Sequence, residues 1–226
     1  MTVLLIPGLI CDQTVWKPLV DLLDGNPAVA DLTTQDCLTQ MATDCLTKHD
    51  GPLQVAGHSM GARVAMEMAR LAPDRITRLA LLDTGIHPLA DGEIDKRNAI
   101  VQFAHDNGMQ ALADRWLPGM IYNPNKTAAL MQRLTDMVLR ADPDLHDRHI
   151  HALINRPDAA AYLADIPCPT LLMVGRQDQW SPVSQHQDML ALLPNATLEI
   201  IENAGHFAPI EQPAKVAQLC ADFLTG

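Results

Sequence analysis

The feature that most constrains the fold is a regular alternation of short apolar runs with helical patterns. The runs, rich in branched residues, occupy 3–6, 28–32, 53–56, 76–82, 170–174 and 196–201. Helical patterns cover 12–23, 35–48, 60–71, 183–192 and 213–224. This alternation is typical of a largely parallel sheet covered by helices on both faces. We therefore predict an α/β protein with a mostly parallel, six-stranded sheet.

The alternation stops between residues 86 and 163, where only helical patterns occur. The clearest pattern places five apolar residues on one helix face: Leu130, Met131, Leu134, Met137 and Val138. A helical block between two sheet strands predicts an insertion. We expect a helical cap at 86–163 and a core formed by 1–85 together with 164–226.

Composition narrows the class of protein. The chain has 226 residues, of which 48% are hydrophobic and 19% charged, so it can bury a substantial core. Its formal charge of -11, without a basic cluster, argues against nucleic acid and anionic membranes as partners. The apolar start is broken by Pro7 and Gly8, which favours a core strand over a signal peptide, and no run could span a bilayer. Five scattered cysteines without paired spacing predict reduced thiols and a cytoplasmic location: Cys11, Cys37, Cys45, Cys168 and Cys220.

The stretch AGHSMGARV places Ser59 where a predicted strand ends and a helix begins. A turn that sharp brings neighbouring backbone close, so Gly57 and Gly61 are needed where a side chain would collide. The turn lifts the serine hydroxyl out of the sheet and directs the following helix N-terminus at it, where an anion could be stabilised. We predict that Ser59 is a nucleophile. The alternative is a serine that only caps a helix.

Two later loops could supply the base and the acid that a serine nucleophile needs. Asp178 follows one apolar run in GRQDQWSP, and His206 follows the next in ENAGHFAPIEQP. Because the carboxyl ends of parallel strands meet at one edge, we expect Ser59, Asp178 and His206 to converge there. Asp83, which ends its strand in LALLDTG, is an alternative acid, although the loop of Asp178 is the better match.

The motifs PGL, GHSMG, GRQD and AGHFAPIEQP, in this order, resemble the α/β-hydrolase superfamily in its small, capped, serine esterase-like branch. The resemblance implies that Ser59 is the nucleophile, His206 the general base and acid, and Asp178 the carboxylate that orients the histidine. It further implies an oxyanion hole formed by the amides of Met60 and Leu9, with Ile10 as the alternative second donor.

The chain departs from the family pattern in two places. The family usually has two further strands before the glycine loop, so the sheet should have six strands and lack the first two. Pro7-Gly8 stands where a His-Gly pair is frequent. Since a backbone amide does the stabilising, this change should not abolish activity.

Several other residues have competing interpretations. Ile10, Trp16, Trp116, Trp180 and Phe207 are candidate pocket walls, and ordinary core positions fit the four aromatic residues equally well. His58 should be a packing residue, because neighbours in such a turn point apart. The histidines of HDRHIH, His146, His149 and His151, favour a solvated helix face over a metal site. Cys11 has no nearby base in the sequence, so we do not expect it to be reactive.

The expected function is hydrolysis of a small or medium, mostly apolar carboxylic ester through an acyl-enzyme. The expected partner is a small acyl substrate, and no metal, nucleotide or flavin is implied. The same triad could instead cleave a carbon-carbon bond beside a ketone, a lactone or a thioester. A ligand receptor without turnover is a further alternative, and the oligomeric state stays open.

Overall fold

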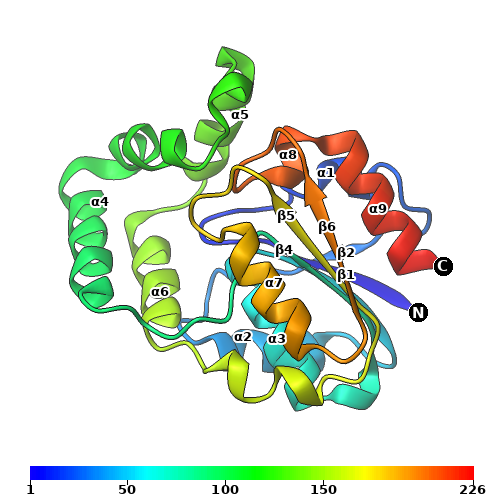
Figure 1. The fold of residues 1–226 in the computed structure, drawn as a ribbon. Helices are drawn as coiled ribbons and strands as arrows, with labels where there is room; N and C mark the ends of the chain where they lie inside the picture. Colours follow the sequence, from blue (N-terminus) through cyan, green and yellow to red (C-terminus); the bar gives the residue numbers. More distant parts are fainter.

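The computed structural model describes residues 1–226, which form one six-stranded sheet with all neighbouring strands parallel (Figure 1). The strand order is β2-β1-β3-β4-β5-β6. The strands are β1 (Thr2–Ile6), β2 (Ala28–Val29), β3 (Leu53–His58), β4 (Ile76–Leu82), β5 (Thr170–Gly175) and β6 (Ala196–Ile201). The predicted α/β class and six-stranded parallel sheet are therefore confirmed.

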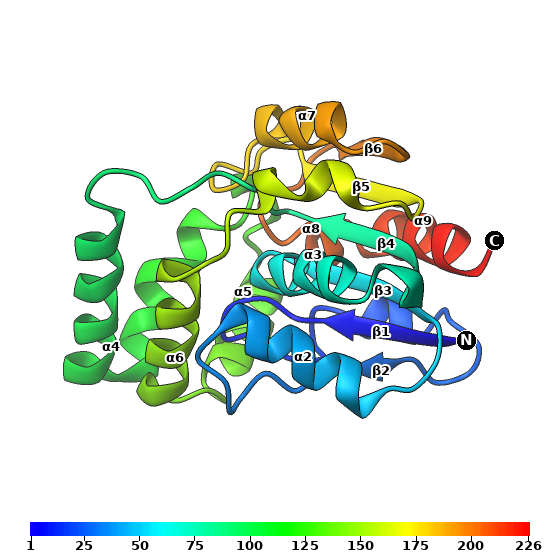
Figure 2. The ribbon, with the colours of Figure 1, turned by 90° about the horizontal axis from the view of Figure 1, so that it is seen from below.

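Helices cover both faces of the sheet (Figure 2). One face packs against α2 (Leu38–Lys48), α3 (Met60–Leu71) and α7 (Val183–Leu192), and the other against α1 (Lys17–Val20) and α9 (Pro213–Thr225). The short α8 (Ala208–Glu211) precedes α9. The strand arrows in Figure 2 point toward α4 (Glu93–Trp116) and α6 (Pro143–Ile154), so these helices lie beyond the carboxyl ends of the strands. The remaining helix, α5 (Ala128–Val138), lies between them in the chain.

The central strands are buried on both sides, which explains why they read as continuous apolar runs. In β1, Leu5 packs into the cluster under α1 and α9, while Leu4 and Ile6 pack into the cluster under α2 and α3. Alternate strand residues point to opposite faces, so a single strand contributes to both clusters.

Two predicted elements are shorter than expected. Helix α1 covers four residues and not 12–23, and its late start is explained by Pro18, which has no amide hydrogen and fits only the first turn of a helix. Before it, the amides of Val15 and Trp16 donate to the carbonyls three residues earlier. Strand β2 is limited to two residues at the sheet edge, where it pairs only with β1.

Between β4 and β5 the chain forms only helices and single 3-10 turns. Helix α4 changes direction at Gly108, whose φ of 79° is left-handed. The predicted apolar face of α5 is present: Leu134, Met137 and Val138 are buried, and Leu130 and Met131 pack against the same cluster. The division into a core and a cap at 86–163 stays our interpretation of this arrangement.

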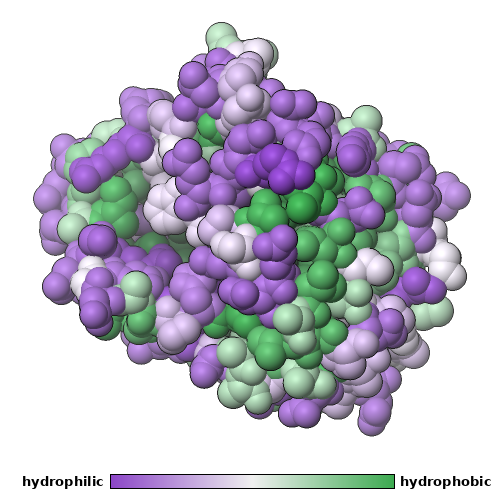
Figure 3. All heavy atoms as spheres, viewed as in Figure 1, coloured by the Kyte–Doolittle hydropathy of each residue, from purple (hydrophilic) through white to green (hydrophobic).

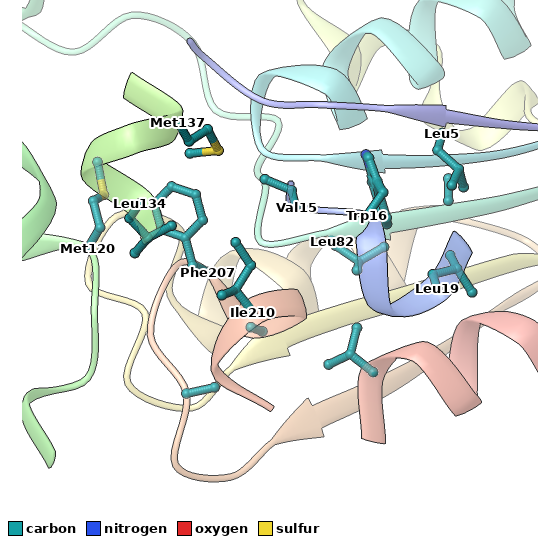
Figure 4. Packing of buried hydrophobic residues seen from close by; sticks show 14 of the residues in the cluster. Leu5, Val15, Trp16, Leu19, Leu82, Met120, Leu134, Met137, Phe207 and Ile210 are labelled. Atoms are coloured by element: carbon teal, nitrogen blue, oxygen red, sulfur yellow. The ribbon is translucent and has the colours of Figure 1, made fainter. Parts of the chain in front are cut away.

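The cap helices join the core through an apolar cluster around Phe207. In Figure 4 the Phe207 ring lies beside Leu134 and Met120, with Met137 close by. Phe207 follows directly after His206, so the cap packs against the segment that carries the predicted catalytic histidine. No helix in the structure has both the length and the hydropathy to cross a membrane.

Candidate active site

Ser59 occupies a strained turn between β3 and α3. Its backbone angles are φ 54° and ψ -115°, which a residue with a side chain rarely adopts. A side chain at Gly57 would overlap the backbone of Gly61 and Ala62, and one at Gly61 would overlap the carbonyl of Ile6. The two glycines thus permit the close contact that holds the serine in its turn, as the sequence predicted.

The structure brings the three predicted triad residues together. The Oγ of Ser59 lies 2.8 Å from Nε2 of His206, and Nδ1 of that histidine lies 2.8 Å from Oδ2 of Asp178. Asp178 and His206 are buried, with 4% and 6% of their surface exposed. This geometry supplies a nucleophile, a base in contact with it and a carboxylate that fixes the tautomer of the base.

Asp178 is held as a carboxylate by its surroundings. Burial raises its pKa, but the charge and hydrogen bond of His206 and the amides of Ser181 and Trp180 outweigh burial and keep the pKa below its usual value. Its Oδ1 accepts from these amides at 3.0 and 2.8 Å, which leaves Oδ2 for the histidine. Asp178 is therefore both fixed in orientation and negatively charged.

Two backbone amides near Ser59 are available to an oxyanion. The amide of Met60 is the first of α3, so it has no acceptor within the helix. The amide of Leu9 has no acceptor within the protein, and both residues line the same cavity as Ser59. A Cβ on Gly8 would lie 3.2 Å from the Cβ of Ser59, so the Leu9 loop runs close beside Ser59.

The alternative donor, Ile10, is occupied. Its amide donates to Nδ1 of His149 at 3.1 Å, and Nε2 of the same ring donates to the carbonyl of Leu32 at 2.9 Å. These two bonds fix the ring as the Nε2-H tautomer, and burial lowers its pKa. His149 is thus a structural support for the loop that carries Leu9.

The expectation of a solvated face for HDRHIH is wrong for two of its histidines. His146 and His149 are each 2% exposed, and only His151 is exposed. His149 contacts the core segments of Ile10 and Leu32, whereas His146 lines the cavity on the side where α6 packs against α4. Burial lowers the pKa of His146 to about 4. No group of three or more His, Cys, Asp or Glu side chains is placed to hold a metal ion.

His58 and Asp83 lie behind the triad rather than in it. Nε2 of His58 donates to the carbonyl of His206 at 2.8 Å, and burial lowers its pKa to about 3. Asp83 accepts from the amides of Gly175 and Ala208, at 2.9 and 3.2 Å, and lies 3.7 Å from His58. The structure therefore places Asp178, not Asp83, on His206.

A cavity of about 530 Å³ opens over Ser59 between the core and helices α4 and α6. Figure 3 shows the molecule hollowed on this side, with hydrophilic residues around the opening. Trp116, Trp180 and Phe207 line the cavity as proposed from the sequence. Trp16 and Ile10 do not, because both are buried in the core, where Trp16 lies near Leu19 and Leu82 (Figure 4).

Sequence reasoning missed the charged part of the cavity wall. Five cationic residues and one carboxylate line the cavity: Arg63, Lys96, Arg97, Arg115, Arg156 and Glu93. Four of the five cations belong to 86–163, where no sequence pattern indicates which side chains face Ser59. Arg63 could have been found, since it lies one helical turn after Ser59.

Comparison with known proteins places this chain in a family. Residues 3–219 match the model of the Alpha/beta hydrolase family. A Pseudomonas savastanoi pv. phaseolicola protein named for carbamate hydrolysis, RutD, is 30% identical over 209 residues, covering 87% of this chain and 78% of that protein. A Pseudomonas putida hydrolase named for 2-hydroxy-6-oxononadienedioate and 2-hydroxy-6-oxononatrienedioate is 27% identical, covering 76% of this chain and 62% of that protein.

Among solved structures, a malate-bound thermophilic esterase from Thermogutta terrifontis superposes with a TM-score of 0.90 at 27% identity. The match covers 99% of this chain and 89% of the esterase. With the family model spanning nearly the whole chain and hydrolases among its relatives, this protein is a hydrolase that belongs to the Alpha/beta hydrolase family.

Proposed function

We propose that this protein hydrolyses a small or medium carboxylic ester through a covalent acyl-enzyme. The observation that carries the proposal is the unbroken chain of contacts from Ser59 Oγ through His206 to Asp178, each 2.8 Å long. Such an arrangement increases the nucleophilicity of an alcohol at neutral pH.

The contacts define the role of each residue. Ser59 Oγ attacks the ester carbonyl carbon while Nε2 of His206 accepts the hydroxyl proton. The resulting imidazolium is stabilised by Asp178, and the amides of Leu9 and Met60 donate to the oxyanion. The carbon-oxygen bond to the alcohol then breaks as His206 returns the proton to the leaving oxygen. Water, deprotonated by His206, then attacks the acyl carbon. The bond from this carbon to Ser59 Oγ breaks as His206 returns the proton to Oγ, which releases the acid and restores Ser59.

The cavity sets the size of the substrate. A volume of about 530 Å³ lies within the range of small-molecule sites. Ile100, Leu112 and Met120 contribute apolar surface to its wall, so hydrocarbon parts of an ester can be buried there.

Turnover of p-nitrophenyl butyrate by the parent and two serine variants tests the proposal. Ser59→Ala should lower kcat by several orders of magnitude, because the nucleophile is lost while the cavity stays intact. Ser184→Ala is the matched control, since Ser184 is exposed on α7 and does not line the cavity. Equal turnover by Ser59→Ala and the parent would refute the mechanism.

Labelling and a substrate panel complete the test. A fluorophosphonate probe should modify Ser59 in peptide mapping, and modification of another residue would contradict the assignment. A panel of esters, lactones, thioesters and ketones with a scissile carbon-carbon bond separates the ester assignment from the alternatives that use the same triad.

A further inference from the structure

The cavity over Ser59 carries the opposite charge to the molecule as a whole. Five of the sixteen Lys and Arg residues line it, but only one of the twenty-seven acidic residues, although the chain has a net charge of -11. The lining therefore has four more positive than negative groups. A cavity with this sign attracts anions.

The single carboxylate of the lining is already engaged. Glu93 accepts two hydrogen bonds from Arg156, at 2.8 and 3.0 Å, and a third from Arg97 at 2.7 Å. These contacts hold the pKa of Glu93 well below its usual range. Arg156 has further acceptors in the carbonyls of Leu153 and Pro88. Arg156 and Glu93 thus satisfy each other and leave no carboxylate oxygen for a third arginine.

Arg63 is the buried cation of the lining that has no hydrogen-bond or ion-pair partner in the protein. It is 9% exposed, lines the cavity, and its guanidinium donates no hydrogen bond to any group of the protein. Burial and the charges of Arg156 and Arg97 lower its pKa to about 10, so it is still a cation at neutral pH. The charge of Glu93 acts on Arg63 without a hydrogen bond. A largely buried cation with no hydrogen-bonded anion is costly, and an anionic group bound in the cavity would offset that cost.

Arg63 lies on the same helix that Ser59 caps, and both residues line the cavity. Ser59 caps α3 and Arg63 lies four residues further, about 6 Å along the helix axis. An arginine fork matches the two oxygens of a carboxylate. We propose that the ester carries a carboxylate, bound by Arg63 while the ester carbonyl lies at Ser59. This inference rests on the proposed ester hydrolysis and specifies its substrate as a half-ester or another ester acid.

Matched pairs of esters test the proposal. Monoethyl glutarate and ethyl pentanoate place a carboxylate or a methyl group at the same end of the acyl chain. 3-(Butanoyloxy)propanoate and propyl butanoate make the same comparison on the alcohol side, and monoethyl succinate and adipate vary the length. Acid release is monitored with a pH-stat. We expect kcat/KM for at least one anionic ester to exceed that of its neutral partner tenfold or more.

Variants of Arg63 assign the preference to its side chain. Arg63→Gln should lower the ratio of anionic to neutral kcat/KM by about 30-fold, the loss expected for one charge-assisted contact. Arg63→Lys should restore part of the ratio, because it keeps the charge without the fork. Arg176→Gln is the control, since Arg176 pairs with Glu202 on the surface and does not line the cavity; it should leave the ratio unchanged.

The outcomes separate this inference from the proposed function. A neutral ester that is the better substrate in every pair, or an Arg63→Gln variant that lowers both members equally, would overturn the carboxylate site and leave ester hydrolysis standing. If no ester is hydrolysed, the proposed function fails, and calorimetry with glutarate on Ser59→Ala decides the site. If glutarate binds Ser59→Ala/Arg63→Gln at least tenfold more weakly than Ser59→Ala, the carboxylate site is supported. If glutarate does not bind Ser59→Ala, the carboxylate site is refuted.

Discussion

The amide of His206 donates a 2.8 Å hydrogen bond to the carbonyl of Met120, which joins the loop of His206 to the segment after α4. Glu211 strengthens the same junction. One of its carboxylate oxygens accepts from the amide of Gly205 at 2.8 Å, and the other from the amide of Tyr122 at 2.9 Å. The residue before His206 and the segment after α4 are thus held by a single side chain.

We therefore expect Glu211→Gln to act on His206 as a positioning change. A glutamine has only one acceptor oxygen, so its NH₂ group would face one of the two amides, at a cost of about 1–3 kcal/mol. We expect kcat for a neutral ester to fall about tenfold with little change in KM, together with slower fluorophosphonate labelling well below the melting temperature. If Glu211→Gln loses stability and keeps both rates, Glu211 has a structural role only.

Asp178→Asn should lower kcat by about three to four orders of magnitude, with KM nearly unchanged. The amide oxygen would accept from Trp180 and Ser181, and the NH₂ group would face Nδ1 of His206, which forces the tautomer that cannot take the proton from Ser59. The measurement is the steady-state kinetics of purified variants.

Asp83→Asn is the contrast for this variant, because Asp83 is equally buried but accepts from backbone amides rather than from His206. Its effect on kcat should be at least 100-fold smaller than that of Asp178→Asn. Equal losses from the two variants would make Asp83 part of the proton path.

The sequence predicted the triad because each of its residues stands in a motif that is local. The turn around Ser59 needs only Gly57, Gly61 and a strand-helix junction, and Asp178 and His206 follow strands whose carboxyl ends share one edge. A parallel sheet brings such loops together whatever the rest of the chain does.

The cap residues could not be placed in this way, because their environment depends on how helices dock. The spacing of His146 and His149 indicates a helix face but not whether it meets solvent or the core, and docking of α6 buries both. The charged cavity wall could not be predicted for the same reason, since residues between 93 and 156 come near Arg63 only in the folded chain. The side to which Trp16 points could not be predicted for a related reason, because an aromatic residue near an oxyanion loop can face either the cavity or the sheet.

Four buried histidines predict that the protein loses stability in mild acid. Burial lowers the pKa of His58 to about 3, of His146 and His186 to about 4, and of His149 below its usual value. Each is neutral when folded but takes up a proton when unfolded below about pH 6.5. The stability they contribute is present above that pH and is lost as the pH falls, by up to about 1.4 kcal/mol per pH unit for each.

Two buried carboxyls oppose this trend, because burial raises the pKa of Asp83 and of Glu211 and lets the folded state bind protons as well. Because four histidines destabilise the folded state as the pH falls and only two carboxyls oppose them, we expect a net loss of stability in mild acid. Urea unfolding at pH 8, 6.5 and 5 should show a falling free energy of unfolding, and His146→Leu should reduce the slope. A constant free energy across this range would contradict the assignment of these rings as neutral.

Arg156 connects the two segments through which the chain passes between core and cap, one before α4 and the other after α6. Its main partner is Glu93. Arg156, with its side chain 3% exposed, donates to the carbonyls of His87 and Pro88 before α4 and of Leu153 at the end of α6, and pairs with Glu93 at 2.8 Å. Removing one member of a buried pair typically costs about 3–5 kcal/mol, so Glu93→Gln should destabilise the protein at pH 7 by about 3 kcal/mol.

The pH dependence of this loss follows from the lowered pKa of Glu93. A carboxylate with a lowered folded-state pKa contributes stability above its unfolded pKa of about 4.5 and loses it as the pH falls further. The difference in unfolding free energy between the parent and Glu93→Gln should thus be constant from pH 7 to 5 and shrink below 4.5. Lys17→Gln breaks an exposed helix pair with Asp21 and should change stability by less than about 1 kcal/mol. If Glu93→Gln changes stability as little as this control, the charge of Glu93 does not contribute to holding the cap on the core.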